Sequence, residues 1–500
     1  MTSDTLLTGL YLTTLIGLGL FGLHRAWMVL RFRWGARPAY GVLDHTGAPV
    51  VTVQLPLYNE RTVAARLIRC IGALDYPRDR LEIQVLDDST DETRAIVEAE
   101  VTELQRCGLD ARVIRRPTRA GFKAGALAYG LALSRGELVA IFDADFVPRP
   151  DFLRALVPIF RDERIGMVQA RWEHRNRDES LLTRAQSTLL DGHFVIEHTV
   201  RFDSGLFFNF NGTAGIWRRD AIVSPGGWQH DTLTEDLDLS YRAQLAGWLF
   251  VYAPNVTAPA EVPAELGGFQ SQQHRWAKGS AQVARKLASR IARAPIPLRV
   301  KLEAYAHLAG NTGYPLVIVL AALLPIVTTG GITLSAPWHL AAFLLCTLSV
   351  ILFYERGQRA LGRSRLQRLL DVPAAMALGV GMSLAQTRAV LSGIFCGTGE
   401  FVRTPKRGDA PATARYRVLF GHWPWFELAF AVWFAIGIVR AAGEQLWGSL
   451  PFLVLFFFGF TWVGFLSLRE RLAARERPAP ADPVPETDED TMLVGGRSPG

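Results

Sequence analysis

Cysteine is scarce in this chain, and no two of its cysteines lie close together in the sequence. The 500 residues contain four, at Cys70, Cys107, Cys346 and Cys396. No pair has the short spacing of a metal knuckle or of a redox motif. The sequence therefore argues against a disulfide framework, and we expect the polar part of the chain to lie in the cytosol.

The chain also lacks a basic stretch interleaved with aromatic residues, although its formal net charge is +7. The arginines instead form short clusters beside apolar runs, as at Arg31 and Arg33 and between Arg359 and Arg368. Such clusters are typical of loops on the cytoplasmic face of a bilayer, where anionic lipid lies close. We therefore expect a lipid bilayer as a partner, and no nucleic acid.

Charge is missing from several long apolar runs, and 49% of the residues are hydrophobic. The first run, Leu6 to Leu23, precedes a basic cluster and predicts a transmembrane helix whose C-terminal end lies in the cytoplasm. A signal peptide is the alternative, but no basic residue precedes the run and no clear cleavage site follows it. Four later runs have spanning length, at residues 308–328, 336–354, 425–439 and 450–466. The sequence thus predicts an integral, multi-pass protein of the inner or plasma membrane.

One more apolar run, residues 372–394, has basic residues on both sides. A simple crossing would place one of these flanks outside, and the run also contains Ser383, Gln386 and Arg388. We therefore expect an interfacial or re-entrant helix. Taken together, the pattern predicts an N-terminal helix in residues 1–34, a catalytic domain in 49–290, membrane and interfacial helices in 291–475, and a disordered tail in 476–500.

Between Pro49 and about Arg290, short β-rich runs alternate with helical stretches. The expected strands are residues 50–55, 81–86, 111–114 and 138–142, and the expected helices are residues 61–73, 92–107 and 123–133. Such alternation predicts an α/β, Rossmann-like domain with a largely parallel sheet and helices on both faces. Ligands of these sheets bind at the carboxyl ends of the strands.

Acidic residues follow three of the expected strands. Two carboxylates that flank one small residue, Asp143 and Asp145, can hold Mg²⁺ or Mn²⁺, and such an ion neutralises a diphosphate. The alternative is an acidic turn with helix caps. Asp87 and Asp88 could receive a hydroxyl of a base or ribose, or they could belong to a capped helix N-terminus.

Two polar motifs stand at expected helix starts. Lys123 lies between Gly121 and Gly125, which suits a phosphate, but the spacing is not that of a P-loop. Residues 234–238 open a helix with Thr234 at its cap, and an acidic first turn is ordinary helix chemistry. The functional alternative makes Asp236 a general base that takes a proton from an acceptor hydroxyl.

Residues 207–215 mix phenylalanines with Asn211, Gly212 and Thr213. Aromatic faces stack on the C–H faces of a pyranose, while amides and hydroxyls reach its oxygens. The alternative is a turn that leads from a core strand.

Gln272-x-x-Arg275-Trp276 joins an amide, a guanidinium and an indole. Arg275 could pair with phosphate oxygens, and Trp276 could contact an acceptor sugar. An amphipathic helix on the membrane, anchored by Trp276, is the alternative, and both readings can hold together.

In this order and spacing, the motifs resemble the processive family 2 glycosyltransferases of the cellulose synthase superfamily. The resemblance covers about Val50 to Lys286 and rests on Asp87 or Asp88, Asp143-x-Asp145, the Thr-Glu-Asp that ends at Asp236, and Gln272-x-x-Arg275-Trp276. The chain is most similar to the cellulose-synthase-like A group, the mannan and glucomannan synthases, through segments such as residues 121–127, 169–172 and 211–215.

The resemblance implies a GT-A-type domain that carries out an inverting transfer from a nucleotide sugar, either GDP-mannose or UDP-glucose. It implies that Asp236 is the catalytic base, with Glu235 beside it, and that Asp143 and Asp145 bind Mg²⁺ or Mn²⁺. The implied donor contacts are Tyr58, Glu60, Asp87, Asp88, Lys123, Asp143, Gln272 and Arg275. The implied acceptor contacts are Trp276, Asn211, Gly212 and Thr213.

Residues 401–406 are similar to the gating loop of cellulose synthases, although Arg403 stands where that loop has valine. This similarity implies a cytosolic gating loop near residues 399–410, with Thr404 and Lys406 as further donor contacts. The expected function is polymerisation of a β-linked, β-1,4 polysaccharide such as mannan, glucomannan or glucan. The growing glycan would cross the membrane between the helices, and an accessory export subunit is a further candidate partner.

Two other functions stay open at this point. An enzyme of similar fold could add one sugar to a membrane lipid, as ceramide and diacylglycerol glucosyltransferases do, and some of these share the Gln-x-x-Arg-Trp motif. The later apolar runs and the segment at Phe401 favour a polymerase instead. A catalytically silent subunit or export channel that kept the fold is the second alternative, and the intact acidic motifs argue against it.

Overall fold

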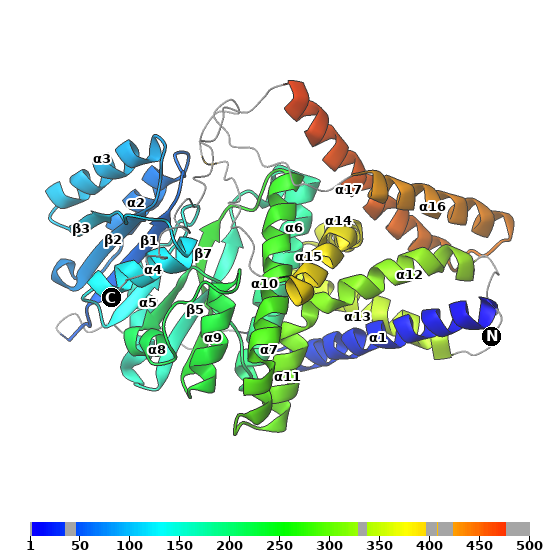
Figure 1. The fold of residues 1–500 in the computed structure, drawn as a ribbon, viewed down its shortest axis with the longest axis horizontal. Helices are drawn as coiled ribbons and strands as arrows, with labels where there is room; N and C mark the ends of the chain where they lie inside the picture. The colour runs from blue at the N-terminus through cyan, green and yellow to red at the C-terminus, as the bar shows by residue number, and fades with distance from the viewer. Residues whose placement is uncertain (1–2, 36–46, 329–337, 397–407, 409–423, 477–500) are drawn as a thin grey trace, which may run out of the picture.

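The computed structural model describes residues 3–35, 47–328, 338–396, 408 and 424–476. A β-sheet with its covering helices forms one side of the molecule, and a group of long helices forms the other (Figure 1). Helix α10 (Leu266–Arg293) stands between the two parts. The expected loop contacts Thr404 and Lys406 and the expected tail lie outside the described residues, and the expected domain boundaries stay a prediction.

The sheet has seven strands in the order β3-β2-β1-β4-β6-β5-β7. Their bounds are β1 (Val51–Leu57), β2 (Leu81–Asp87), β3 (Asp110–Ile114), β4 (Leu138–Ile141), β5 (Ile165–His174), β6 (Gly215–Arg218) and β7 (Leu249–Ala260). The four strands expected from the sequence are all present. The expectation of a largely parallel sheet needs one correction, because β6 runs antiparallel to both β4 and β5. The turn before β6 reverses the chain there, with positive φ at Gly212 and Ala214.

Helices cover both faces of the sheet, as expected. One face packs against α2 (Ala64–Gly72) and α3 (Thr93–Arg106), and the other packs against α4 (Phe122–Leu133). Alternate residues of the central strands enter the two cores, since successive side chains of a strand point to opposite faces. Val53 and Leu55 belong to the first core, while Val139 and Ile141 belong to the second.

The parallel register brings three strand ends together. Leu57 of β1 pairs with Asp87 of β2, and Gln54 of β1 pairs with Ile141 of β4. The segments that follow these strands therefore leave the sheet at the same edge. The rest of this part comprises α5 (Phe152–Leu156), α6 (Leu181–Asp191), the π-helix η4 (Gly192–Glu197), α7 (His198–Asp203), α8 (Arg219–Val223), α9 (Glu235–Leu245) and α11 (Leu298–Leu308).

Within the described residues, seven further helices make up the other side of the molecule. They are α1 (Ser3–Arg31), α12 (Gly313–Thr328), α13 (Trp338–Ala360), α14 (Arg365–Gly381), α15 (Ser383–Phe395), α16 (Pro424–Gly443) and α17 (Leu450–Glu476). Within the described residues, four helices are long and apolar enough to cross a membrane, at Leu6–Arg31, Gly310–Thr328, Pro424–Gly443 and Leu450–Ala473. They match four of the five expected spans. Residues 336–354 fall mostly in α13, which is not among those four, so that crossing stays a prediction.

The run at residues 372–394 is not one continuous helix. It is divided between α14 and α15, which meet at Met382 with a bend of 52°. Gly381 lies so close to the backbone of Gly459 in α17 that a Cβ there would be 2.3 Å from the Gly459 carbonyl oxygen. A bent pair of this kind fits a broken span or a re-entrant loop, so the re-entrant expectation stays open.

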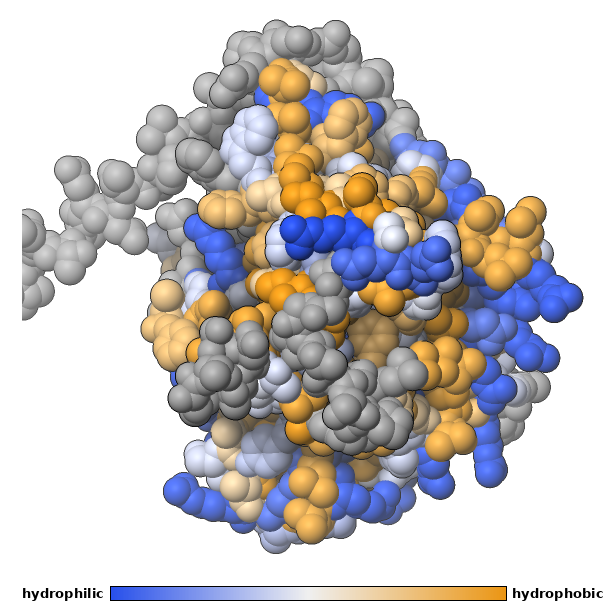
Figure 2. Space-filling model, turned by 90° about the vertical axis from the view of Figure 1, so that its right-hand side faces the viewer, coloured by the Kyte–Doolittle hydropathy of each residue, from blue (hydrophilic) through white to orange (hydrophobic). Residues whose placement is uncertain are grey.

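Large apolar side chains are exposed on the outer helices. Leu20 of α1, Val432 and Val439 of α16 and Phe465 of α17 each expose more than half of their surface. In the end-on view, apolar residues run through the top and centre of the face, and many polar ones lie along its right-hand and lower margins (Figure 2). An apolar surface of this extent marks an interaction with a membrane or a partner.

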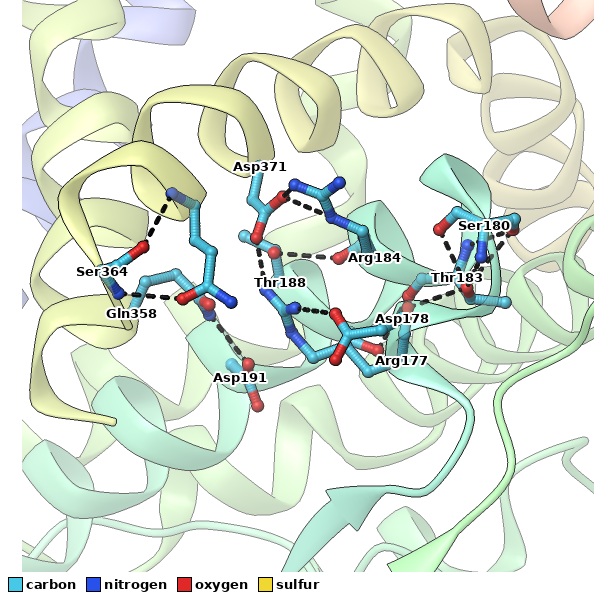
Figure 3. A network of polar contacts seen from close by, with 12 residues as sticks. Arg177, Asp178, Ser180, Thr183, Arg184, Thr188, Asp191, Gln358, Ser364 and Asp371 are labelled. Carbon is cyan, nitrogen blue, oxygen red and sulfur yellow. Dashed lines mark hydrogen bonds and ion pairs between the residues drawn. The ribbon is translucent and has the colours of Figure 1, made fainter. Parts of the chain in front are cut away.

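Buried polar contacts tie α13 and α14 to the sheet domain (Figure 3). Asp371 of α14 has no exposed surface and pairs with Arg177 and with Arg184, whose Nε lies 2.9 Å from Asp371 Oδ1. Gln358 of α13 donates from Nε2 to Oδ2 of the buried Asp191 at 2.8 Å. These contacts fix the angle at which the two helices leave the sheet domain.

Replacing Asp371 by asparagine is expected to destabilise the folded protein by about 3–5 kcal/mol, because Arg177 then lies buried without a full counter-charge. Thermal unfolding of the detergent-purified protein measures this change. Asp178→Asn is the matched control, since Asp178 also pairs with Arg177 but its side chain is 71% exposed. Equal melting temperatures for both variants would contradict the prediction.

Candidate active site

A cavity of about 170 Å³ opens where β1, β2 and β4 end, beside the first half of α10. The structure brings nearly all of the expected site residues into its lining. They are Tyr58, Glu60, Asp88, Lys123, Asp143, Asp145, Asn211, Gly212, Glu235, Asp236, Gln272, Arg275 and Trp276. Asp87 and Thr213 are the two described exceptions.

The turn after β4 carries the two expected metal ligands. The Asp143 backbone N–H donates to Thr213 Oγ1 at 2.9 Å, and Asp143 Oδ1 accepts a bond from Lys123 Nζ at 2.6 Å. Asp145 is 2% exposed, and its Oδ2 accepts from the Glu261 N–H at 3.3 Å. Both carboxyl groups therefore sit on one short, well-anchored turn at the cavity wall.

Two carboxylates alone make an incomplete metal site. Within the described ranges, no group of three or more His, Cys, Asp or Glu side chains is arranged to hold an ion. Mg²⁺ commonly binds through one or two carboxylates and takes its other ligands from water and substrate phosphates. Asp143 and Asp145 thus fit a divalent ion that is bound together with a diphosphate.

Lys123 connects this turn to the turn before β6. Its Nζ donates to Asp143 Oδ1 and, at 2.9 Å, to the carbonyl oxygen of Gly212. Burial acts to lower the pKa of Lys123, but the charges of Asp143 and Glu235 outweigh it and raise the pKa. The lysine is therefore charged. Its positive charge balances part of the negative charge of the cavity before a cation or a donor binds.

Glu235 and Asp236 begin α9 at the cavity. Burial raises the pKa of Asp236 to about 7, with the neighbouring Glu235 charge as the next cause, whereas Lys123 acts in the opposite direction. Burial likewise raises the pKa of Glu235. A carboxyl group that titrates near neutral pH is matched to general-base catalysis.

The expected cap of this helix is wrong in one respect. Thr234 occupies the N-cap position, but its hydroxyl makes no capping hydrogen bond. Its side chain instead packs against Gly279 of α10, where a Cβ would lie 2.5 Å from Thr234 Cγ2. The Thr234 side chain therefore packs against α10 and does not form the cap that the local sequence predicts.

Asp87 and Asp88 each pair with an arginine. Asp87 Oδ2 accepts from Arg115 Nε and Nη2 at 3.1 and 3.0 Å, and its Oδ1 accepts from the Ser89 N–H. Asp87 is 1% exposed and does not line the cavity. The geometry therefore does not support the expected contact between Asp87 and the donor. Asp88, held by Arg116 at 2.9 and 2.5 Å, does face the cavity.

The aromatic residues in 207–215 belong to the core rather than to the cavity. Phe208 and Phe210 are buried in the second core. Thr213 is fully buried too, and its hydroxyl holds the Asp143 backbone instead of facing an acceptor. Only Asn211 and Gly212 of this segment reach the cavity.

The Gln272-x-x-Arg275-Trp276 motif lies on α10 with all three side chains at the cavity. Burial lowers the pKa of Arg275, and the nearby charges of Glu235, Asp143 and Asp236 oppose that shift. The Trp276 ring lies 6.4 Å from the ring of Trp172, centroid to centroid. The motif therefore brings a cation and an aromatic surface to the acidic edge.

Arg119, Trp172 and Glu261 are among the cavity residues that were absent from the expected set. The Arg119 guanidinium lies 3.4 Å over the Tyr58 ring, Trp172 ends up opposite Trp276, and Glu261 accepts from Arg66 Nη2 at 2.7 Å. Trp172 lies in the segment 169–172 that contributed to the family resemblance, so a signal for it existed. Arg119 and Glu261 have no local motif, and only the fold brings them to the site.

A second cavity, of about 520 Å³, lies between the catalytic part and the long helices. Residues of α1, α12, α13, α14 and α17 contribute to its lining. Six residues line both cavities: Trp172, Leu190, Asn211, Thr234, Asp236 and Trp276. The acidic site thus opens toward the interior of the helix group.

Comparison with known proteins places the chain. A model described as "Glycosyltransferase like family 2" matches residues 48–279. Glucomannan 4-beta-mannosyltransferase 2 of Arabidopsis thaliana is 47% identical over 256 residues, which are 50% of this chain and 48% of that protein. Glucomannan 4-beta-mannosyltransferase 7 of the same plant is 36% identical over 401 residues, which are 76% of this chain and 69% of that protein. This chain belongs to glycosyltransferase family 2.

Within family 2, the chain belongs to the cellulose-synthase-like A group, as its motifs predicted. It spans about half the length of the first of these relatives. The structure of mannosyltransferase PcManGT from Pyrobaculum calidifontis, in complex with GDP-Man and Mn²⁺, matches with a TM-score of 0.54 at 24% identity, over 78% of this chain and 99% of that one. That likeness confirms the expected GT-A-like fold.

Lys123→Met tests the electrostatics of this family 2 site. Because Lys123 lowers the pKa of Asp236, its removal is expected to raise that pKa further above 7. Asp236 then becomes an unprotonated base only at higher pH, so the acidic limb of a pH–activity profile moves upward. Lys301→Met is the control, because Lys301 lies in the first turn of α11 and lines neither cavity. An unshifted limb in Lys123→Met would contradict this electrostatic coupling.

Proposed function

We propose that this family 2 glycosyltransferase is a membrane-embedded, inverting hexosyltransferase that polymerises a β-linked glycan and passes it across the bilayer. The observation that carries the proposal is the continuity of the two cavities through Asp236 and Trp276. A product formed at Asp236 has direct access to the space among the long helices. The polymer is a mannan, glucomannan or glucan, with β-1,4 linkages.

GDP-mannose is the preferred donor, because the curated relatives are named as glucomannan 4-beta-mannosyltransferases. UDP-glucose is the second candidate. Tyr58, Asp88, Lys123 and Arg275 surround the part of the cavity at the strand ends, where this fold class binds its nucleotide. The two cations face the charge of a diphosphate, and the Tyr58 ring provides an apolar face.

Asp236 is proposed to remove the proton from the acceptor hydroxyl as that oxygen attacks the anomeric carbon. Attack occurs on the face opposite the departing diphosphate, so the configuration inverts. The raised pKa of Asp236 makes its carboxylate basic enough to accept the proton at neutral pH. Glu235 supports this by keeping a second negative charge beside it.

Asp143 and Asp145 would hold Mg²⁺ or Mn²⁺, which supplies charge neutralisation to the leaving diphosphate when bound. Lys123 shares that task from the protein side. Thr213 keeps Asp143 in place through the backbone N–H, which makes it a support for the ligand rather than a sugar contact.

The acceptor is proposed to enter from the second cavity and to lie against Trp276, with Trp172 close by. Aromatic faces pack on sugar rings without fixing their hydroxyl groups, which suits a chain that must move by one residue per cycle. With the catalytic part in the cytosol, the basic segment around residues 359–368 also lies at the cytoplasmic surface, as positive charge favours.

Asp236→Asn is expected to reduce transfer by at least about 10²–10⁴-fold while nucleotide binding persists, because the amide keeps its shape but cannot take a proton. Sugar release from GDP-[¹⁴C]mannose and a GDP titration measure the two properties separately. Asp231→Asn, a carboxylate whose side chain is 56% exposed, serves as the control. Full activity of Asp236→Asn would remove that residue from the mechanism.

Gly379→Phe is expected to obstruct the second cavity. Gly379 lines it, and a Cβ there would meet nothing within 4 Å, so the ring can enter the open space. Products should become shorter on a sizing gel, while donor hydrolysis is retained. Gly9→Phe in α1 is the control, because Gly9 is exposed, has equal room and lines neither cavity.

The same gel separates the rival function. Polymers of unchanged length from Gly379→Phe would contradict the channel. A single labelled glycolipid from the unmodified protein, without polymer, would replace polymerisation by one addition to a membrane lipid.

A further inference from the structure

Asn211 stands at the junction of the two cavities and is clamped by two histidines. It lines both cavities, and it lies next to Gly212, where an added Cβ would be 2.9 Å from Asp236 Oδ2. His198 Nε2 lies 2.7 Å from Asn211 Oδ1, and His193 Nε2 lies 2.8 Å from Asn211 Nδ2. The orientation of this amide decides what it offers to a sugar.

The backbone carbonyl of Asn209 determines which nitrogen of His198 carries a hydrogen. Its Nε2 is also 3.1 Å from the carbonyl oxygen of Asn209, which can only accept a hydrogen bond. His198 Nε2 must therefore carry a hydrogen, and the Asn211 atom that faces it must be the acceptor Oδ1. Its other nitrogen, Nδ1, is buried without a partner among the described residues, as expected for a neutral ring.

The same logic then determines which nitrogen of the His193 ring carries the hydrogen. Asn211 Nδ2 faces His193 Nε2, so that nitrogen must present its lone pair. The hydrogen of His193 lies on Nδ1, from which it donates to Glu197 Oε2 at 3.0 Å. One assignment of hydrogens thus satisfies all of these contacts, with the His198 Nε2 hydrogen shared between Asn211 Oδ1 and the Asn209 carbonyl oxygen.

Buried charges hold this arrangement in place. Burial, with the charge of Arg201 acting in the same direction, lowers the pKa of His198 well below its usual range, so His198 stays neutral. Burial acts to raise the pKa of Glu197, but Arg201 and His193 bring it well below its usual value. Arg201 donates from Nη1 to Glu197 and from Nε to Glu303 of α11, both at 3.0 Å.

The π-helix η4 explains how His193 reaches the junction. The wider turn spans residues 192–197 between α6 and α7, and such insertions often occur at functional sites. It places His193 at the second cavity and leaves Glu197 within bonding distance, four residues on.

The clamp leaves half of the Asn211 amide unused. An amide has two N–H hydrogens and two lone pairs on oxygen. His193 takes one hydrogen and His198 takes one lone pair, which leaves one donor and one acceptor. A sugar hydroxyl is itself one donor with lone pairs, so it can satisfy both remaining positions.

We propose that His193 and His198 are positioning residues that fix the Asn211 amide so that it binds a hydroxyl of the acceptor sugar beside Asp236. This inference rests on the proposed glycosyltransferase function of the same site. The histidines act through Asn211 and leave the donor cavity unchanged, since neither lines it.

A matched pair of variants at His193 tests the clamp. His193→Gln keeps an acceptor near the Nε2 position that serves Asn211, whereas His193→Asn keeps a donor near the Nδ1 position that serves Glu197. The full-length protein in detergent is assayed with GDP-mannose and mannotetraose. The KM for each substrate, mannotetraose affinity from tryptophan fluorescence, and the melting temperature are measured.

His193→Asn is expected to raise the KM and the dissociation constant for mannotetraose by about tenfold, because the amide loses one of its two restraints. The KM for GDP-mannose should not change. In His193→Gln, the values for mannotetraose should return most of the way to those of the unmodified protein.

Equal values for mannotetraose in the two variants, whether raised or unchanged, would overturn the clamp while leaving the proposed function intact. A larger effect of His193→Gln than of His193→Asn would overturn it too. If the unmodified protein transfers no hexose, the proposed function fails, and the fluorescence titration still ranks the variants and decides the clamp by itself.

Discussion

The ion pair between Lys123 and Asp143 is the contact on which the rest of the site depends. It joins the start of α4 to the turn after β4, and the second bond of Lys123, to Gly212, adds the turn before β6. Glu235 and Asp236 lie within its electrostatic reach. Without that cation, Glu235 and Asp236 would lose the largest positive charge that favours their charged forms, and burial would raise their pKa values further.

The boundary between the sheet domain and the long helices is built from polar contacts that are themselves buried. Asp371 with Arg177 and Arg184 fixes α14, and Gln358 with Asp191 fixes α13. Breaking such pairs is costly, so the two parts keep one relative orientation. That orientation determines whether the second cavity meets the first. Among the described residues, six form the meeting point.

Much of the fold could be predicted because its signals are local. Strands β1 to β4 and helices α2 to α4 follow from the change between alternating and helical periodicity. Parallel pairing then brings the acidic segments after β1, β2 and β4 to one edge. Where local patterns gave a wrong prediction, the cause was a neighbour distant in sequence. Asp87 pairs with Arg115, and Phe208 and Phe210 pack in the second core. The side chain of Thr234 packs against α10.

The sequence by itself determined the family and the acidic edge at which Asp143, Asp145 and Asp236 lie, since motif order and strand periodicity are properties of the chain alone. Only the tertiary structure decided that β6 is antiparallel, that Thr213 supports Asp143, and that Asn211 is held by His193 and His198. Each of these depends on atoms brought together from segments far apart or through an irregular turn. No local pattern encodes such distances, because they result from how whole elements pack.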